Sequence, residues 1–259
     1  MLTRILTGIV GIVLFAAAII APPIVLYAAL FLVCTGLLYE TYRVMDAKWQ
    51  LQIVGILAEI IMFGLFAVGR IGMALYGAIF LFMTAMVFFW KKSNSKETLP
   101  LGMVTIFITS AVLSLVMLRA NFNIFALLLP FIIAWATDTG AYFTGYFLGK
   151  HKLAPEMSPK KTIEGAIGGI IIAMIATVVY GLILYGNFYV YGMIKYAIVG
   201  GLGSIVAQVG DLVASCIKRD FGKKDYGTLL PGHGGLMDRF DSVLFAAPYV
   251  FFMIVYFGI

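Results

Sequence analysis

Residues 166–185 read AIGGIIIAMIATVVYGLILY, twenty successive positions without a charged side chain. An α-helix of about 20 residues is about 30 Å long, which matches the hydrocarbon thickness of a bilayer. The apolar residues follow one another without the alternation of period two that a half-buried strand shows. Because lipid offers the backbone no hydrogen-bond partners, this run predicts a helix that crosses a membrane.

Similar runs occur along the whole chain of 259 residues, of which 63% are hydrophobic and 12% charged. This composition excludes a disordered chain, a collagen-like repeat and an ordinary water-soluble enzyme. We therefore expect an all-α integral membrane protein with about nine transmembrane helices. The expected ranges are 5–21, 24–40, 51–69, 71–90, 101–118, 124–148, 166–185, 196–217 and 240–259. A cleaved signal peptide is the alternative for the first range.

The basic residues are distributed unevenly between the loops. With nine spans, the N-terminus and the even-numbered loops hold 15 of the 18 Lys and Arg residues, and the odd-numbered loops hold three. Cytoplasmic loops of membrane proteins are enriched in Lys and Arg, so we expect the N-terminus and the even loops in the cytoplasm. The net charge of +6 then reflects this topology rather than binding to nucleic acid.

Charged residues also concentrate in the second half of the chain. Residues 211–241 carry ten of the thirty charges. The polar stretch KKSNSKETLP, residues 91–100, is the best boundary between the halves. We interpret residues 1–97 as an N-terminal transmembrane scaffold and residues 98–259 as a C-terminal transmembrane catalytic region.

Four acidic residues lie within or at the end of expected spans. Asp138 and Asp211 lie inside the sixth and eighth spans, where a charged carboxylate facing lipid is costly. Asp238 and Asp241 share one face at the cytoplasmic start of the ninth span. Each acid also has a structural alternative. This is a packing contact for Asp138, an ion pair with Lys218 for Asp211, and helix capping for Asp238 and Asp241. Because Mg²⁺ and Mn²⁺ prefer oxygen ligands, convergence of these acids would suit a metal site.

Two basic segments, which we expect to be loops, are suited to phosphate. Residues 158–165, SPKKTIEG, offer two ammonium groups, hydroxyls and backbone N–H groups before a helix. Residues 218–235 offer four more cations among glycines, which allow close approach of the backbone to a ligand. No GxxxxGK[ST] loop, zinc-type Cys/His spacing or GxSxG turn occurs, which excludes the corresponding classes of protein.

Residues 215–241, SCIKRDFGKKDYGTLLPGHGGLMDRFD, resemble the signature of the phosphatidate cytidylyltransferase (CDP-diacylglycerol synthase) family. The segments 138–142 (DTGAY) and 158–165 and the pair Gly210–Asp211 also look like this family. The resemblance implies transfer of CMP from CTP to phosphatidic acid, which gives CDP-diacylglycerol and pyrophosphate in phospholipid biosynthesis. It also implies Mg²⁺, with Mn²⁺ as an alternative and a second metal ion expected. It implies a multi-pass protein of the inner cell membrane, often a homodimer, with its active site facing the cytoplasm.

The resemblance also implies roles for individual residues. Asp211 and Asp238 are the strongest expected metal ligands, followed by Asp241 and Asp138. The phosphatidate phosphate is expected to attack the CTP α-phosphorus in line, while cations hold the phosphates. His233 is expected to donate a hydrogen bond to a phosphate, or to orient a carboxylate that holds the metal, rather than to act as a base, because a phosphate monoester is largely ionised at pH 7. The expected catalytic residues are Asp211, Asp238, Asp241, Lys218 and Arg239. The expected substrate-binding residues are Ser158, Lys160, Lys161, Thr162, Ser215, Arg219, Lys224, Asp225, His233, Gly234, Gly235 and Asp138.

Three other classes of function are weighed against this one. A transporter predicts inverted repeats and acids near the membrane midplane, whereas the sequence has no visible repeat and its acids cluster to one side. An enzyme that consumes CDP-diacylglycerol would carry D-x2-D-G-x2-A-R-x8-G-x3-D-x3-D, which is absent. A non-catalytic scaffold would not turn over CTP. Glu59, in the third span, is expected to make a packing contact.

Overall fold

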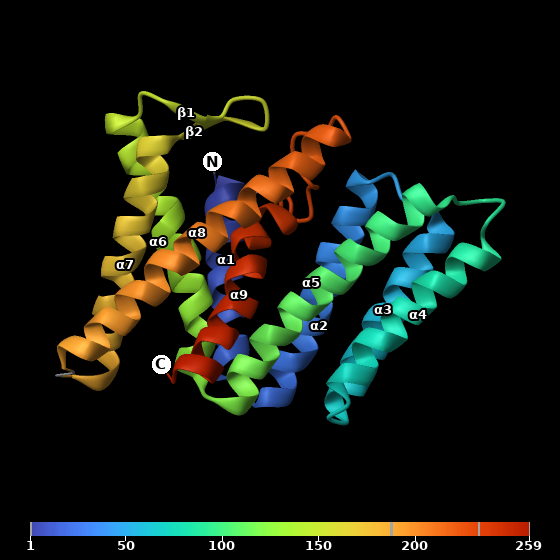
Figure 1. The fold of residues 1–259 in the computed structure, drawn as a ribbon, viewed down its shortest axis with the longest axis horizontal. Coiled ribbons are helices and arrows are strands. Elements are labelled where there is room, and N and C mark those ends of the chain that lie inside the picture. Colours follow the sequence, from blue (N-terminus) through green and yellow to red (C-terminus); the bar gives the residue numbers. More distant parts are fainter. Residues whose placement is uncertain (1, 187–188, 233, 259) are drawn as a thin grey trace. The chain divides into compact units, whose positions relative to one another are not determined.

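The computed structural model describes residues 2–186, 189–232 and 234–258. Within these residues the chain forms nine α-helices and one two-stranded antiparallel sheet (Figure 1). The helices are α1 (Leu2–Ile20), α2 (Pro23–Val44), α3 (Trp49–Ala67), α4 (Ile71–Phe88), α5 (Ser95–Asn121), α6 (Ile124–Leu148), α7 (Ile163–Tyr185), α8 (Val190–Asp220) and α9 (Met237–Phe257). The strands are β1 (Lys152–Ala154) and β2 (Ser158–Thr162).

The predicted all-α membrane class is confirmed. In the described part of the chain, eight helices, α2 to α9, are long and apolar enough to cross a membrane. The expected range 124–148 coincides with α6, and each of the other ranges overlaps one helix. The differences lie at helix ends, where polar residues continue a helix beyond its apolar stretch. The orientation of these helices in the membrane stays a prediction.

The chain divides into two compact units. The first unit comprises Met1–Val116 and Asp220–Asp238, and the second comprises Met117–Arg219 and Arg239–Ile259. The central part of the signature segment therefore packs with the N-terminal helices of the first unit. The proposed division into a scaffold, 1–97, and a catalytic region, 98–259, concerns roles and stays a prediction.

Side chains at the helix starts explain where α6 and α7 begin. The Asn123 Oδ1 atom accepts a hydrogen bond of 2.9 Å from the backbone N–H of Ala126. The Thr162 Oγ1 atom accepts one of 3.1 Å from the N–H of Gly165. Each bond satisfies a first-turn N–H group that has no partner inside its own helix.

Helices α6 and α7, side by side in the second unit, pack through small residues (Figure 1). A Cβ atom added at Gly168 would overlap the Thr144 side chain of α6. A Cβ atom added at Gly169 would lie 2.9 Å from the backbone oxygen of Thr137. Such close contacts hold helices together in lipid, where no hydrophobic driving force acts between them.

We expect Gly168→Val to destabilise the protein by roughly 1–3 kcal/mol, the usual cost of overpacking. The new side chain would overlap Thr144, which belongs to the facing helix. The unfolding midpoint of the purified protein in detergent should fall. Gly64→Val is the matched control, because a Cβ atom at Gly64 of α3 meets nothing within 4 Å. Equal midpoints for the two variants would contradict the packing described above.

The segment 158–165 is not the loop that we predicted. Residues Ser158–Thr162 form strand β2, in which Thr162 pairs with Lys152 and Ser158 with Ala154 of β1. The prediction that a helix follows is correct, since α7 begins directly after the strand. The prediction of a loop is wrong because a short polar run with a proline looks like a turn, whereas pairing with β1 orders it as a strand.

Glu164, in the first turn of α7, ties down the start of this hairpin. Its Oε2 atom accepts hydrogen bonds from the backbone N–H groups of Lys150 (3.1 Å) and His151 (3.2 Å). Its Oε1 atom lies 2.6 Å from His151 Nδ1. One carboxylate therefore connects the end of α6, the start of β1 and the start of α7.

Candidate functional site

The second unit contains a pocket of about 570 Å³ between α6, the start of α7, α8 and the hairpin. Five predicted site residues line it: Asp138, Lys160, Lys161, Thr162 and Asp211. The other lining residues are Thr137, Ala141, Tyr142, Gly145, Tyr146, Gly149, Lys152, Leu153, Gly165, Ala166 and Gln208. The fold thus brings together acids from two helices and cations from the hairpin.

An ion pair lies in this pocket. Lys161 Nζ of β2 is 2.6 Å from Asp211 Oδ2 of α8, and the two side chains are 25% and 28% exposed. Ser215 Oγ, one turn further along the same helix, donates to Asp211 Oδ1 at 3.4 Å. The pair with Lys161 links two elements, so Asp211 does more than balance a charge on its own helix. Partly exposed pairs are weak, so a phosphate can compete for this lysine.

The other two predicted acids of the second unit, Asp138 and Asp241, belong to the same electrostatic system. Asp138 interacts with Asp211, and Asp241 interacts with both. A Cβ atom added at Gly210 would lie 2.7 Å from the backbone oxygen of Asp241, so α8 and α9 touch beside these acids. Asp241 is 9% exposed, and its Oδ1 atom accepts the Ser242 N–H at 2.7 Å. The basic residues that interact with the acids are Lys161, Lys218 and Arg239.

The chemistry of these acids suits Mg²⁺, because this ion prefers oxygen ligands such as the carboxylates of Asp138, Asp211 and Asp241. The Asp211 carboxylate already contacts one cation, the Lys161 ammonium group. Within residues 2–186, 189–232 and 234–258, however, no three Asp, Glu, Cys or His side chains are grouped closely enough to hold a metal ion. The donor type is therefore suitable, whereas the described arrangement is not a preformed cluster, and the metal site stays a prediction.

Two further contacts shape this pocket. Arg219 Nε donates to the backbone oxygen of Met157 at 3.3 Å, which connects the end of α8 to the turn of the hairpin. Gln208 Nε2 donates to the backbone oxygen of Ala166 at 3.1 Å. The predicted residue Thr162 lines the pocket while its hydroxyl caps α7. These bonds hold the strand that carries Lys160 and Lys161 against the helices that carry the acids.

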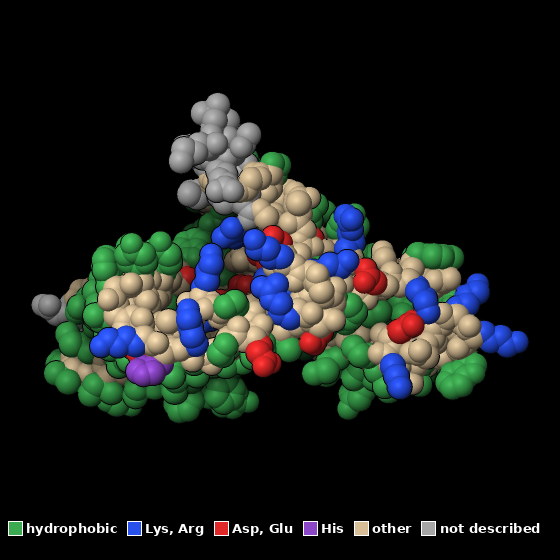
Figure 2. Space-filling model, turned by 90° about the horizontal axis from the view of Figure 1, so that it is seen from above, with side chains coloured by type: hydrophobic (Ala, Val, Ile, Leu, Met, Phe, Trp, Pro, Cys, Tyr) green, Lys and Arg blue, Asp and Glu red, His purple; other side chains and the backbone are tan. Residues whose placement is uncertain are grey.

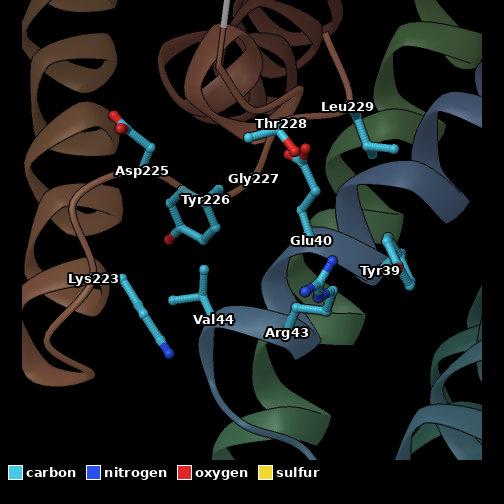
Figure 3. A pocket seen from close by; sticks show the side chains of 10 residues that line it. All are labelled: Tyr39, Glu40, Arg43, Val44, Lys223, Asp225, Tyr226, Gly227, Thr228 and Leu229. Atoms are coloured by element: carbon cyan, nitrogen blue, oxygen red, sulfur yellow. The ribbon is translucent and has the colours of Figure 1, made fainter. Parts of the chain in front are cut away.

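The first unit holds the central part of the signature segment, around a second pocket of about 310 Å³ (Figure 3). Asp238 Oδ2 accepts hydrogen bonds from the N–H groups of Tyr226 (2.9 Å) and Gly235 (3.2 Å). The pocket is lined by Tyr39, Glu40, Arg43, Val44, Lys223, Asp225, Tyr226, Gly227, Thr228 and Leu229. The predicted residues Lys224, Asp225, Gly234, Gly235 and Asp238 thus belong to one folded segment.

Two predictions on this segment remain open. Asp238 belongs to the first unit and Asp211 to the second, so their convergence on one metal ion stays a prediction. His233 lies outside the described residues. Gly234, its neighbour, has a φ of 86°, a left-handed conformation that favours glycine.

Glu40 is the residue near the signature that we did not predict. It stands at the end of an apolar run, where it looked like the boundary of the second span. The structure continues α2 beyond it and buries its carboxylate against the signature segment. The acidic residue in the sequence YETYR, 39–43, was the available signal, but nothing in the sequence indicates its distant partner.

Charged side chains gather beside the hairpin of the second unit (Figure 2). Figure 2 looks at the helix ends beside the hairpin and shows Lys and Arg side chains there, with Asp and Glu between them. Hydrophobic side chains lie along the margin of the same view. This segregation is typical of a membrane protein whose polar site lies at the water interface.

Comparison with known proteins gives a consistent result. The chain is 44% identical over 128 residues to the phosphatidate cytidylyltransferase of Bacillus subtilis (strain 168), covering 49% of this chain and 46% of that protein. It is 48% identical over 122 residues to the phosphatidate cytidylyltransferase of Staphylococcus haemolyticus, covering 47% and 46%. The chain thus spans about half the length of these relatives. The model of the cytidylyltransferase family matches residues 2–257, nearly the whole sequence, and the chain therefore belongs to this family.

Proposed function

We propose that this protein is a phosphatidate cytidylyltransferase, which transfers CMP from CTP to phosphatidic acid and releases pyrophosphate. Family membership, together with the names of the relatives, supports this activity. The observation that carries the proposal is the Lys161–Asp211 pair in a pocket between membrane-type helices and the hairpin. A lipid substrate reaches such a pocket from the bilayer, and a nucleotide reaches it from water.

The reaction joins two anions, so its main obstacle is electrostatic repulsion. An oxygen of the phosphatidate phosphate attacks the α-phosphorus of CTP, a new P–O bond forms, and the bond to the β-phosphate breaks. No hydroxyl proton must be removed, because this phosphate is largely ionised at pH 7. Fixed cations bind the phosphates and stabilise the leaving pyrophosphate. The residues proposed for this task are Lys160, Lys161, Lys218, Arg219, Lys224 and Arg239.

Lys161 has a particular place in this mechanism. It balances Asp211 in the protein as described, and a triphosphate offers it a stronger anionic partner. When Lys161 turns to the phosphate, the Asp211 carboxylate becomes available to a cation. Mg²⁺, held by Asp211 with Asp138 or Asp241, would supply charge neutralisation at the α-phosphate. Mn²⁺ and a second ion of the same class remain part of the proposal.

The direct test is an assay with purified protein, radiolabelled CTP, phosphatidic acid and Mg²⁺. We expect labelled CDP-diacylglycerol and an equal amount of pyrophosphate, with no product when phosphatidic acid or the metal is withheld. Failure to form labelled lipid by a folded preparation would overturn the proposal. Transport of a solute without turnover would support the transporter alternative instead. Light scattering of the detergent-solubilised protein tests the proposed homodimer.

We also propose that the active site faces the cytoplasm, on the basis of the uneven loop charges. Single cysteines at Ser158 and Gly222, in a variant without Cys34 and Cys216, should react with an impermeant thiol reagent only in inside-out vesicles. The expected contrast is near-complete labelling against background. A cysteine at Tyr189, in the loop expected outside, is the matched control and should show the opposite pattern. Labelling of both engineered sites in right-side-out vesicles would refute the topology.

A further inference from the structure

We infer that Glu40 of α2 is a positioning residue, which fixes the start of α9 and the preceding loop of the signature segment. Its effect on catalysis rests on the proposed function, whereas its effect on the loop does not. All groups involved belong to the first unit.

The first observation is a hydrogen bond across 197 positions of sequence. Glu40 Oε2 accepts the backbone N–H of Met237 at 2.8 Å, and α9 begins at Met237. The first N–H groups of a helix have no partner within the helix, and a negative charge is favourable at this end. Glu40 is only 1% exposed, so water does not compete for this bond. A carboxylate from α2 therefore caps α9.

The second observation concerns the two glycines that contact this carboxylate. A Cβ atom added at Gly227 would lie 2.5 Å from Glu40 Oε1, and its three nearest atoms would all belong to Glu40. A Cβ atom added at Gly235 would lie 2.8 Å from both Glu40 Oε2 and Asp238 Oδ2. Only residues without a side chain fit here. The backbone of the loop is therefore seated directly on two carboxylates.

The two acids bind the loop at different points. Asp238 holds it at Tyr226 and Gly235, and Glu40 holds it at Met237. In Figure 3, Glu40 reaches from α2 towards Gly227 and Thr228 of this loop. Asp238 is the second residue of α9, so a displaced helix start would displace this predicted metal ligand.

A role confined to packing does not account for the charge of Glu40. Its Oε1 atom is buried and accepts no hydrogen bond from the described residues. Leaving a buried carboxylate oxygen without a partner costs free energy, which an apolar side chain of similar size would avoid. The favourable interaction of the charge with the start of α9 offsets this cost.

Hydrogen exchange measures the loop independently of turnover. We expect Glu40→Ala to accelerate exchange of the amides in residues 226–237 by roughly tenfold or more, because their anchor is lost. Turnover should fall roughly 10- to 100-fold through kcat, the scale of a misplaced catalytic group. Glu40→Gln keeps an acceptor for Met237 and should fall between Glu40→Ala and wild type in both measurements.

Glu59→Gln is the matched control. Glu59 of α3 is also a fully buried carboxylate of the first unit, but it accepts its hydrogen bond from Thr35 (2.9 Å) and not from the signature segment. Its substitution should leave exchange of residues 226–237 at the wild-type rate. If Glu59→Gln accelerated exchange as much as Glu40→Gln does, the unit would be loosened as a whole, and the inference would be overturned.

A double-mutant cycle tests whether Gly227 and Glu40 affect the loop through their direct contact or through a general loss of stability. Gly227→Ala alone should accelerate exchange, because its Cβ atom displaces the Glu40 carboxylate from Met237. In the Glu40→Ala background the obstructing atoms are gone, so Gly227→Ala should add little. Additive effects, or unchanged exchange in Glu40→Ala, would overturn the inference. If the wild-type protein does not form CDP-diacylglycerol, the proposed function fails, while the exchange results still decide the role of Glu40.

Discussion

Asp211→Asn should lower turnover by roughly 100-fold or more, the scale of losing one group that stabilises charge in a transition state. Asparagine keeps the shape of the side chain but cannot supply the negative charge that holds Lys161 and, in the proposed mechanism, a metal ion. The protein should remain folded, because a partly exposed ion pair contributes about 0–1 kcal/mol. Initial rates across a Mg²⁺ titration and the unfolding midpoint test both statements.

Glu97→Gln is the control for this result. Glu97 makes an ion pair of similar length, 2.7 Å, with Lys48, at 40% and 44% exposure. The substitution removes the same charge from a similar pair outside the candidate site, so turnover should stay near wild type. If Asp211→Asn were as active as Glu97→Gln at every Mg²⁺ concentration, the role assigned to Asp211 would be wrong.

Asp238→Asn should also lower turnover by roughly 100-fold or more, but with a second effect that Asp211→Asn lacks. The Asp238 carboxylate accepts two backbone N–H groups, from Tyr226 and Gly235, through one oxygen atom. The amide is a weaker acceptor than the ion, so exchange at these two amides should accelerate. Rates and hydrogen exchange measured on one preparation test the pair of effects.

Glu97→Gln serves again as the reference, since it should change neither turnover nor exchange at residues 226 and 235. A variant Asp238→Asn that exchanges faster yet turns over normally would leave Asp238 a loop-holding residue only. A variant that matches the reference in both measurements would remove Asp238 from the site altogether.

The helices were predictable because a membrane restricts the choice of structure. A run such as 166–185 has no alternative to a helix in lipid, and α6 was placed to the residue because Asn123 and Gly149 mark its ends. The start of α8 was predicted less accurately. The structure begins this helix at Val190, whereas the hydropathy rule placed the span from 196, after a charged lysine.

The sequence predicted residues that line the pocket, but not the contacts between them. The sequence indicated Lys161 and Asp211 as site residues. Lysines before a helix suit phosphate, and an acid within a membrane span is costly enough to suggest a functional site. That these two side chains pair depends on where the hairpin places β2 relative to α8, which no spacing rule gives. Glu40 was missed for a related reason, since its partners lie almost two hundred positions away.

The bond between Glu40 and Met237 also sets an order of events during synthesis. At about 5–20 residues per second, a ribosome needs roughly 10–40 s to add the 197 residues that separate them. Helix α2 is synthesised by the start of that interval, apart from its last four residues, while its acid still lacks the Met237 donor. The contact between α2 and the start of α9 consequently forms only after Met237 has been made. A polypeptide that stops before Met237 keeps this acid without its donor, a chemical mark of an unfinished chain.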